Sequence, residues 1–182
     1  MKILRSPIIV GLLTATFGVA IAFGIANAQN PPITEAQITR IRSNCVSAKN
    51  TFTQLHASDA LLRVNRGQIY ESMTTKLMSR FNSRAESNHL GASSLVSYTQ
   101  NYSSALAAFR KDYQAYEEQL SNALSIDCTK EPVEFYDSVA SSRIKRTQVH
   151  VDVVILHRYI DDYESAFDDF AANFAKAQTG GE

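Results

Sequence analysis

The chain has 182 residues, and its 18 basic and 18 acidic side chains give a formal net charge of zero at neutral pH. This balance excludes the basic bias of proteins that bind nucleic acid or anionic membrane surfaces. The length is sufficient for one domain with a substantial hydrophobic core. We therefore expect a single domain and no nucleic-acid partner.

Residues 1–28 have the features of an export segment. Lys2 and Arg5 form a short basic start, residues 8–26 carry no charge, and residues 26–28 (Ala-Asn-Ala) match the pattern that signal peptidases cleave. The uncharged run is longer than a usual signal peptide core of about 7–15 residues and close to the roughly 20 of a membrane span. The segment is therefore either a cleaved signal peptide or an N-terminal membrane anchor.

Both interpretations place the rest of the chain outside the cytoplasm, because the basic start stays inside. Cleavage would leave 182 − 28 = 154 residues. We expect residues 29–33, which include two prolines, to form a short linker, residues 34–178 to form the domain, and residues 179–182 to form a flexible tail. Membrane contact is expected only through residues 8–26, and only if the segment is not cleaved.

Cys45 and Cys128 are the only cysteines. In an oxidising compartment a single pair is expected to form a disulfide. The bond would close a loop of 128 − 45 = 83 residues, for which loop entropy allows roughly 4–5 kcal/mol of stabilisation. The alternative, a redox or metal-binding pair, lacks the Cys-x-x-Cys spacing.

The first long helix is expected from residue 34 to a point within residues 82–88. Thr34 and Gln37 match a capping box, in which each side chain bonds the other residue's backbone amide. Gly67 is a weak point that costs about 1 kcal/mol relative to alanine and could mark a bend. The helical spacing of three and four is carried by Ile38, Ile41, Cys45, Ala48, Phe52, Leu55, Leu62, Ile69 and Met73.

Two further helices follow. The second is expected from Ser93 to near Asp127, and the third starts at Pro132, a residue suited to a first helical turn. Residues 149–153 alternate like a strand, but heptads continue on both sides and no second strand candidate exists to pair with them. The second helix's apolar seam consists of Leu95, Tyr102, Leu106, Phe109, Tyr113, Tyr116 and Leu120. The third seam consists of Phe135, Val139, Val149, Val153, Leu156, Ile160, Tyr163, Phe167, Phe170 and Phe174.

These patterns predict an all-α fold, an elongated antiparallel three-helix bundle of the coiled-coil type that follows the export segment. Short connections make consecutive helices run in opposite directions. A turn near residue 90 would bring Cys45, early in the first helix, beside Cys128, which follows the second.

Polar residues interrupt the apolar seams at one level of the predicted bundle. Asp59 lies 59 − 45 = 14 residues after Cys45, and Ser142 lies 142 − 128 = 14 residues after Cys128. Because the cysteines mark one end of the bundle, both interruptions are expected in one layer. The interrupting residues are Asp59, Arg66, Ser142 and Arg146.

The layer needs an internal partner for its acidic group, because an unpaired buried charge is costly. We expect Asp59 to pair with Arg143 or Arg146. Tyr113 or Tyr116 of the second helix should face the layer and supply a hydroxyl group.

Two interpretations of the layer remain open. It could set the register and orientation of the helices, the role best attested for polar core positions. It could instead form a ligand or ion site between helices. In that case a carboxylate or phosphate would be received by Arg63, Arg66, Arg143 and Arg146.

The sequence has no recognisable catalytic or metal-binding motif, and we expect no cofactor and no metal. Glu86 and His89 have the spacing found in di-iron bundles, but the other ligands of such a site are missing. His150 and His157 are seven residues apart, too far to hold one ion. His56 could contact Asp59, but a catalytic pair also needs a nucleophile and an oxyanion donor.

Three functional hypotheses follow. The first is a non-enzymatic helical bundle of the cell envelope that acts as an interaction or structural module with a protein partner. The second is a small-molecule or anion-binding protein with its site at the polar layer. The third is an enzyme of unknown class. Tyr70, Tyr98 and Tyr159 could form an exposed patch for a partner helix or second subunit, but the pattern sets no oligomeric state.

Overall fold

A computed structural model of the chain describes residues 33–179. All regular structure in this range is helical, so the predicted all-α class is confirmed. The elements are α1 (Glu35–Ser72), the π-helix η1 (Met73–Met78), α2 (Ser79–Ser87), α3 (Ser93–Ser125) and α4 (Pro132–Thr179). The expected export segment 1–28, linker residues 29–32 and tail residues 180–182 lie outside the described residues.

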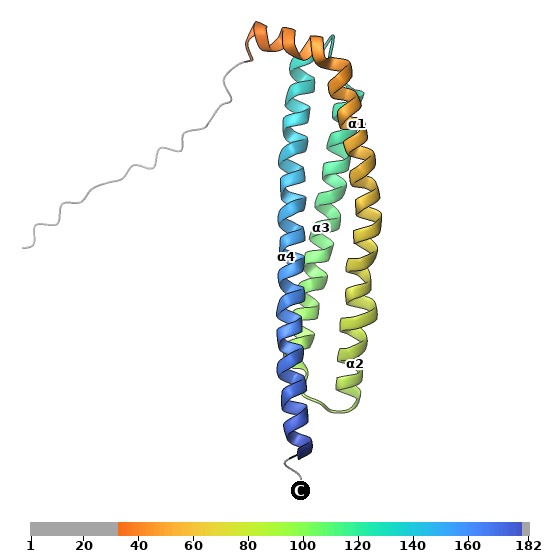
Figure 1. Cartoon of the computed structure of the whole chain (residues 1–182), viewed down its shortest axis with the longest axis vertical. Coiled ribbons are helices and arrows are strands. Elements are labelled where there is room, and N and C mark those ends of the chain that lie inside the picture. Colours follow the sequence, from red (N-terminus) through yellow and green to blue (C-terminus); the bar gives the residue numbers. More distant parts are fainter. Residues whose placement is uncertain (1–32, 180–182) are drawn as a thin grey trace, which may run out of the picture. The chain divides into compact units, whose positions relative to one another are not determined.

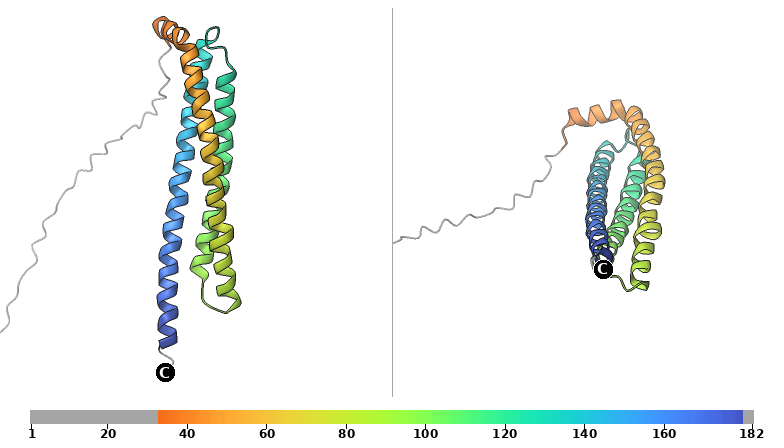
Figure 2. Two further views of the ribbon diagram at one scale, coloured as in Figure 1. Left: turned by 45° about the vertical axis from the view of Figure 1, so that its right-hand side comes forward. Right: turned by 60° about the horizontal axis from the view of Figure 1, so that its bottom comes forward.

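The elements form three long helical segments that lie side by side (Figures 1 and 2). The first consists of α1, η1 and α2 in succession, the second is α3, and the third is α4. The most extensive packing is between α3 and α4, and α1 packs more sparsely against both. Figure 1 shows that the first turns of α1, in orange, lie across the ends of α3 and α4 before the helix runs along them.

The start of α1 is fixed locally by its cap. The Thr34 hydroxyl accepts a hydrogen bond from the Gln37 amide at 3.3 Å, and the Thr34 amide donates to Gln37 Oε1 at 2.8 Å. This is the predicted capping box. It satisfies two amide groups that the first helical turn cannot satisfy.

The same end is tied to the loop between α3 and α4. The sulfur atoms of Cys45 and Cys128 lie at disulfide distance, and their Cα atoms are 5.6 Å apart. Nearby, Arg42 Nε donates to the Thr129 carbonyl at 3.2 Å. A bonded pair of this kind is typical of proteins in an oxidising compartment.

The π-helix η1 interrupts the first segment at a place where the sequence shows no glycine or proline. Its C-cap amide, of Ser79, bonds the carbonyl of Thr74 five residues earlier. Tyrosine hydroxyls bond the first segment on both sides of it, from Tyr102 to the carbonyl of Tyr70 at 3.0 Å and from Tyr163 to Asn82 Oδ1 at 3.0 Å. Gly67, where a bend was considered, lies within regular α-helix, and the irregular turn falls at η1 instead.

The core is centred on α3. Its buried residues follow one another at intervals of four and three, the predicted heptad seam. They are Leu95, Thr99, Tyr102, Leu106, Phe109, Tyr113, Tyr116, Leu120 and Ala123. Residues 149–153 are helical within α4. Near the C-terminal end of α4, the apolar residues of the third seam become exposed to solvent. Phe174 is 41% exposed there, because α4 extends beyond the neighbouring helices (Figure 1).

Candidate functional site

The helices α1 and α4 keep one register along the region of the polar layer. Asp59 bonds Arg146 and Tyr70 bonds His157, and both pairs are 87 residues apart in the sequence (146 − 59 and 157 − 70). A constant separation means that the two helices run in the same direction without slipping. Each residue of α1 in this stretch therefore lies level with the α4 residue 87 positions later.

Asp59 is the centre of the polar layer. Its Oδ2 accepts hydrogen bonds from the Tyr116 hydroxyl at 2.7 Å and from Arg146 Nε at 3.0 Å, and its Oδ1 accepts from Arg146 Nη2 at 3.3 Å. The carboxylate side chain is 11% exposed, whereas that of Arg146 is 53% exposed. Of the alternatives that the sequence left open, the structure brings Arg146 and Tyr116 to Asp59.

Burial and the Asp59 carboxylate raise the pKa values of the groups around them. Burial, and next the hydrogen bond to Asp59, raise the pKa of the Tyr116 hydroxyl, which stays a donor. The hydrogen bonds with Asp59 raise the pKa of the Arg146 guanidinium. Burial also raises the pKa of Tyr113 to about 12. The two tyrosine hydroxyls are therefore neutral at physiological pH.

Tyr113 and Arg63 form a second polar group one turn away. The Arg63 guanidinium lies 5.0 Å from the centre of the Tyr113 ring, within the range of cation–π attraction. Arg63 Nη1 also pairs with Glu117 Oε2 at 3.2 Å. Glu117 was missed from the sequence, although it lies four residues after Tyr113 and therefore on the same face of α3.

Ser142 does not join the ion pair. It is buried, 3% exposed, and its hydroxyl donates to the carbonyl of Ser138 at 2.9 Å in its own helix. A serine side chain is short, so it bonds its own backbone rather than a group on another helix. Ser142 is thus a buried polar residue of the α4 seam, as predicted, but the register of α1 and α4 places Arg146, one turn further on, level with Asp59.

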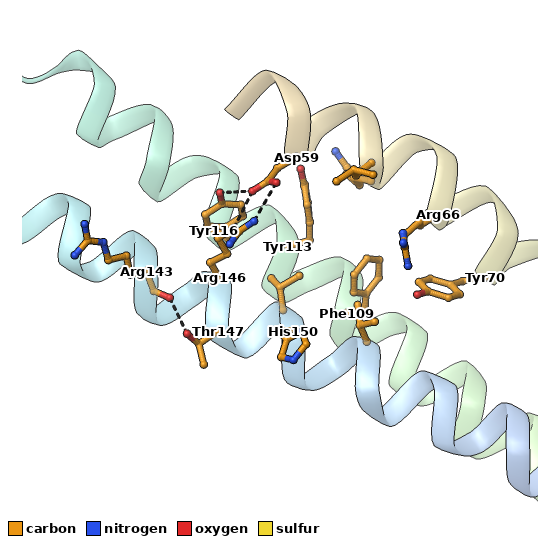
Figure 3. Close-up of a pocket in the computed structure, with 14 residues that line it drawn as sticks. Asp59, Arg66, Tyr70, Phe109, Tyr113, Tyr116, Arg143, Arg146, Thr147 and His150 are labelled. Atoms are coloured by element: carbon orange, nitrogen blue, oxygen red, sulfur yellow. Dashed lines mark hydrogen bonds and ion pairs between the residues drawn. The ribbon is translucent and has the colours of Figure 1, made fainter. Parts of the chain in front are cut away.

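The ion pair of Asp59 and Arg146 lies in a groove of about 560 Å³ between α1 and α4 (Figure 3). Its floor is formed by Phe109, Tyr113 and Tyr116 of α3. Its apolar walls are Leu62 of α1 and Val149 and Val153 of α4, and its other lining residues are Asp59, Arg63, Arg66, Tyr70, Arg143, Arg146, Thr147 and His150. All four arginines proposed as anion ligands from the sequence therefore line one groove.

The arginines form a row along this groove. By the common register, Arg63 is level with position 150 (63 + 87) and Arg66 with position 153 (66 + 87). Together with Arg143 and Arg146 they follow in steps of three, four and three residues. The row spans 153 − 143 = 10 residues, or about 15 Å of helix.

The two ends of the row differ from its middle. Arg146 and Arg63 have carboxylate partners, Asp59 and Glu117. Within residues 33–179, Arg66 and Arg143 form no ion pair. The end arginines therefore remain available for an external anion, and guanidinium groups bind carboxylates and phosphates through paired hydrogen bonds.

Tyr70 contradicts the expected tyrosine patch. It is 4% exposed, its hydroxyl lies 3.1 Å from His157 Nε2, and its ring meets Phe109 edge-on at 5.7 Å. Tyr98 and Tyr159 are partly buried. The expected stripe ran through Leu62 and Ile69, whereas the face that lines the groove near the end of α1 runs through Arg66 and Tyr70, four residues apart. Ile69 is instead 59% exposed.

No cluster of three or more histidine, cysteine or acidic side chains that could hold a metal occurs among residues 33–179. No helix in that range is long and apolar enough to cross a membrane.

Comparisons with protein-family models, curated proteins and solved structures found no match to this chain. The fold and the groove define an all-helical protein with an arginine-lined groove between two parallel helices. Because an all-helical fold is compatible with many activities, function is inferred from the groove itself.

Proposed function

We propose that the chain is an exported, non-enzymatic helical-bundle protein of the cell envelope, and that it binds an acidic segment of a protein partner in the groove between α1 and α4. The observation that carries this proposal is the row of four arginines over an apolar floor. Arg66 and Arg143, at its ends, have no carboxylate partner among the described residues.

The proposed architecture is an elongated antiparallel three-helix bundle of the coiled-coil type over residues 34–178. It is supported by the heptad seam of α3 and by the constant register between α1 and α4. The close approach of Cys45 and Cys128 supports an oxidising location outside the cytoplasm. Residues 1–28 would deliver the domain there, either as a cleaved signal peptide or as an anchor.

The dimensions of the row favour an extended peptide. An extended chain advances about 3.3 Å per residue, so roughly five residues cover the 15 Å between the end arginines. Acidic side chains at both ends of such a segment would meet Arg143 and Arg66. Apolar side chains between them would contact Phe109, Val149 and Val153.

The contacts of His56 favour binding over catalysis. The Ser121 hydroxyl lies 3.5 Å from His56 Nε2, and Glu117 lies 4.0 Å from the same nitrogen. A catalytic triad uses both ring nitrogens, one toward the nucleophile and one toward the acid. His56 therefore lacks the relay geometry, and its contact is not with Asp59, the partner considered from the sequence.

The test is fluorescence anisotropy with a labelled peptide in which Phe-Leu-Phe is flanked by two glutamates on each side. The non-reduced protein should bind this peptide, and added salt should weaken binding. Replacing both Arg66→Gln and Arg143→Gln should weaken it tenfold or more, because each charged hydrogen bond contributes about 1.5–3 kcal/mol. The matched control, Arg80→Gln with Arg84→Gln on α2, removes the same charge outside the groove and should bind normally.

The alternative function is binding of a small anionic molecule. The groove volume of about 560 Å³ falls within the roughly 300–1,000 Å³ usual for such ligands. Binding of dodecanoate but not of the peptide, lost in the Arg66 and Arg143 double variant, would favour this alternative. An unchanged peptide affinity in that double variant would contradict the proposed function, and dodecanoate binding that persists in the double variant would contradict the alternative.

A further inference from the structure

The side of α4 that faces solvent carries a regular pattern that the groove does not use. Asp137, Ile144, Val151 and Arg158 follow one another at intervals of seven residues, the spacing of a coiled-coil seam. Ile144 is 73% exposed and Val151 is 42% exposed. Beside them on the same side lie Ala140, Thr147, Val154 and Ile155. The side is therefore apolar in its middle, with an acid at one end and a base at the other.

The pattern is complementary to itself when two copies run in opposite directions. The position numbers of the outer and inner pairs have the same sum, since 137 + 158 = 295 and 144 + 151 = 295. A two-fold axis between positions 147 and 148 would therefore place Asp137 opposite the partner's Arg158. The same axis would place Ile144 opposite the partner's Val151.

The charged residues at the two ends of this pattern, Asp137 and Arg158, can pair with another molecule. Both Asp137 and Arg158 are exposed, and neither forms an ion pair within the described range. The Arg158 guanidinium only rests over the ring of Tyr159 at 5.3 Å. A parallel pairing would bring equal charges together at both ends, so the charges favour the antiparallel direction.

We propose that a second copy of this chain docks on this side of α4, giving a two-fold symmetric dimer with an antiparallel α4–α4 contact. A two-fold interface uses the same surface on both subunits, so each Asp137–Arg158 contact occurs twice. The contact would run over 158 − 137 = 21 residues, about 30 Å of helix. One helix pair is a small interface, so the dimer dissociates on dilution. Thr147 borders both this side and the groove, but the arginines of the groove take no part in the contact, so this inference does not rest on the proposed function.

The first test is sedimentation velocity of the non-reduced protein over a series of concentrations up to the submillimolar range. The wild type should shift from monomer to dimer as concentration rises. Ile144→Glu should remain monomeric, because it places a charge in the apolar middle. The control Leu61→Glu, at a site on α1 that is 64% exposed, should dimerise like the wild type. Circular dichroism checks that each variant is folded.

The second test reverses the charges and depends on no apolar change. Arg158→Asp puts like charges at both ends of the contact and should weaken the dimer several-fold. Adding Asp137→Arg to that variant restores opposite charges in the antiparallel register and should restore dimerisation. A wild type that stays monomeric throughout, an Ile144→Glu variant that dimerises normally, or a double variant that is not rescued would overturn the proposal.

Discussion

At the residue scale, Asp152 is the least satisfied ionisable group of the described core. It is 5% exposed, and Gln148 Nε2 donates to its Oδ1 at 3.1 Å. Its Oδ2 is buried and has no hydrogen-bond partner within the described residues. Burial raises the pKa of this carboxyl group, with a smaller contribution from Asp112 on α3. The ionised form therefore weakens the folded state.

The predicted consequence concerns Asp152→Asn. A folded-state pKa above the unfolded value means that the folded protein binds this proton more tightly. Its contribution to the free energy of unfolding is therefore present in acid and is lost as pH rises above about 3.9 and through the raised pKa. Asparagine carries no charge at any pH, so the variant should melt at a higher temperature than the wild type near neutral pH.

Thermal unfolding followed by circular dichroism checks this prediction. The melting temperatures of variant and wild type should converge at a pH well below the usual aspartate pKa of about 3.9. Asp168→Asn, at an exposed position of α4, provides the control and should show no such pH-dependent gain. An Asp152→Asn gain that is absent near neutral pH would contradict the account of this group.

At the scale of elements, η1 adjusts the helical phase between α1 and α2 so that both can pack against α3. A π-helical turn amounts to one extra residue in an α-helix. Tyr102 and Tyr163 fasten the first helical segment on either side of it, by hydrogen bonds to the Tyr70 carbonyl and to Asn82 Oδ1. The insertion lets α1 and α2 both face α3 although their apolar residues do not share one continuous α-helical phase.

Deleting a single residue tests this view. Removal of Lys76, which is exposed within η1, should convert the π-helix into α-helix and leave the flanking helices in place. The melting temperature should then stay close to that of the wild type. Removal of Lys111, exposed in α3, should be strongly destabilising because it turns the rest of that helix by about 100°. Equal losses in the two deletion variants would show that η1 does not absorb the extra residue.

The sequence predicted the elements better than their irregularities. Heptad spacing and caps predicted three helical segments with ends close to those found, for example Pro132 as the start of α4. Counting from Cys45 and Cys128 placed Asp59 level with Ser142. The observed register places it level with Arg146, one turn further on, because Cys128 lies in the loop before α4 begins.

The burial of Tyr70 and Asp152, the turn at η1 and the groove were not predicted, because they depend on the exact helical phase and on contacts between helices. Tyr70 was assigned to the surface because the expected stripe ran through its neighbour Ile69. The turn at η1 was not predicted because it contains no glycine or proline. Asp152 lies beside the apolar seam of α4 and is buried only because α3 packs closely there. The groove exists because α1 packs sparsely against α4, which no local pattern encodes.

At the scale of the whole domain, the cysteine pair joins the sparsely packed first segment to the tightly packed α3–α4 pair. It closes a loop of 83 residues. Replacing Cys45→Ser with Cys128→Ser should lower the free energy of unfolding by up to roughly 4–5 kcal/mol. Urea unfolding of the double variant measures the loss.

The loss should begin in α1, because its packing is sparser than that of α3 and α4. Amide hydrogen exchange of the serine double variant should accelerate most for α1 and least for the centre of α3. Uniform acceleration across all helices would contradict this division of the domain.

The central inference is that the arginine groove is the binding site of this protein. Its most direct test is an NMR titration of the arginine Nε–Hε signals of the non-reduced protein with the glutamate-flanked Phe-Leu-Phe peptide. We expect saturable shifts of the Arg66 and Arg143 signals, with those of Arg80 and Arg84 unchanged. Signals of Arg66 and Arg143 that stay unmoved while the peptide binds elsewhere, or no shifts at any peptide concentration, would contradict it.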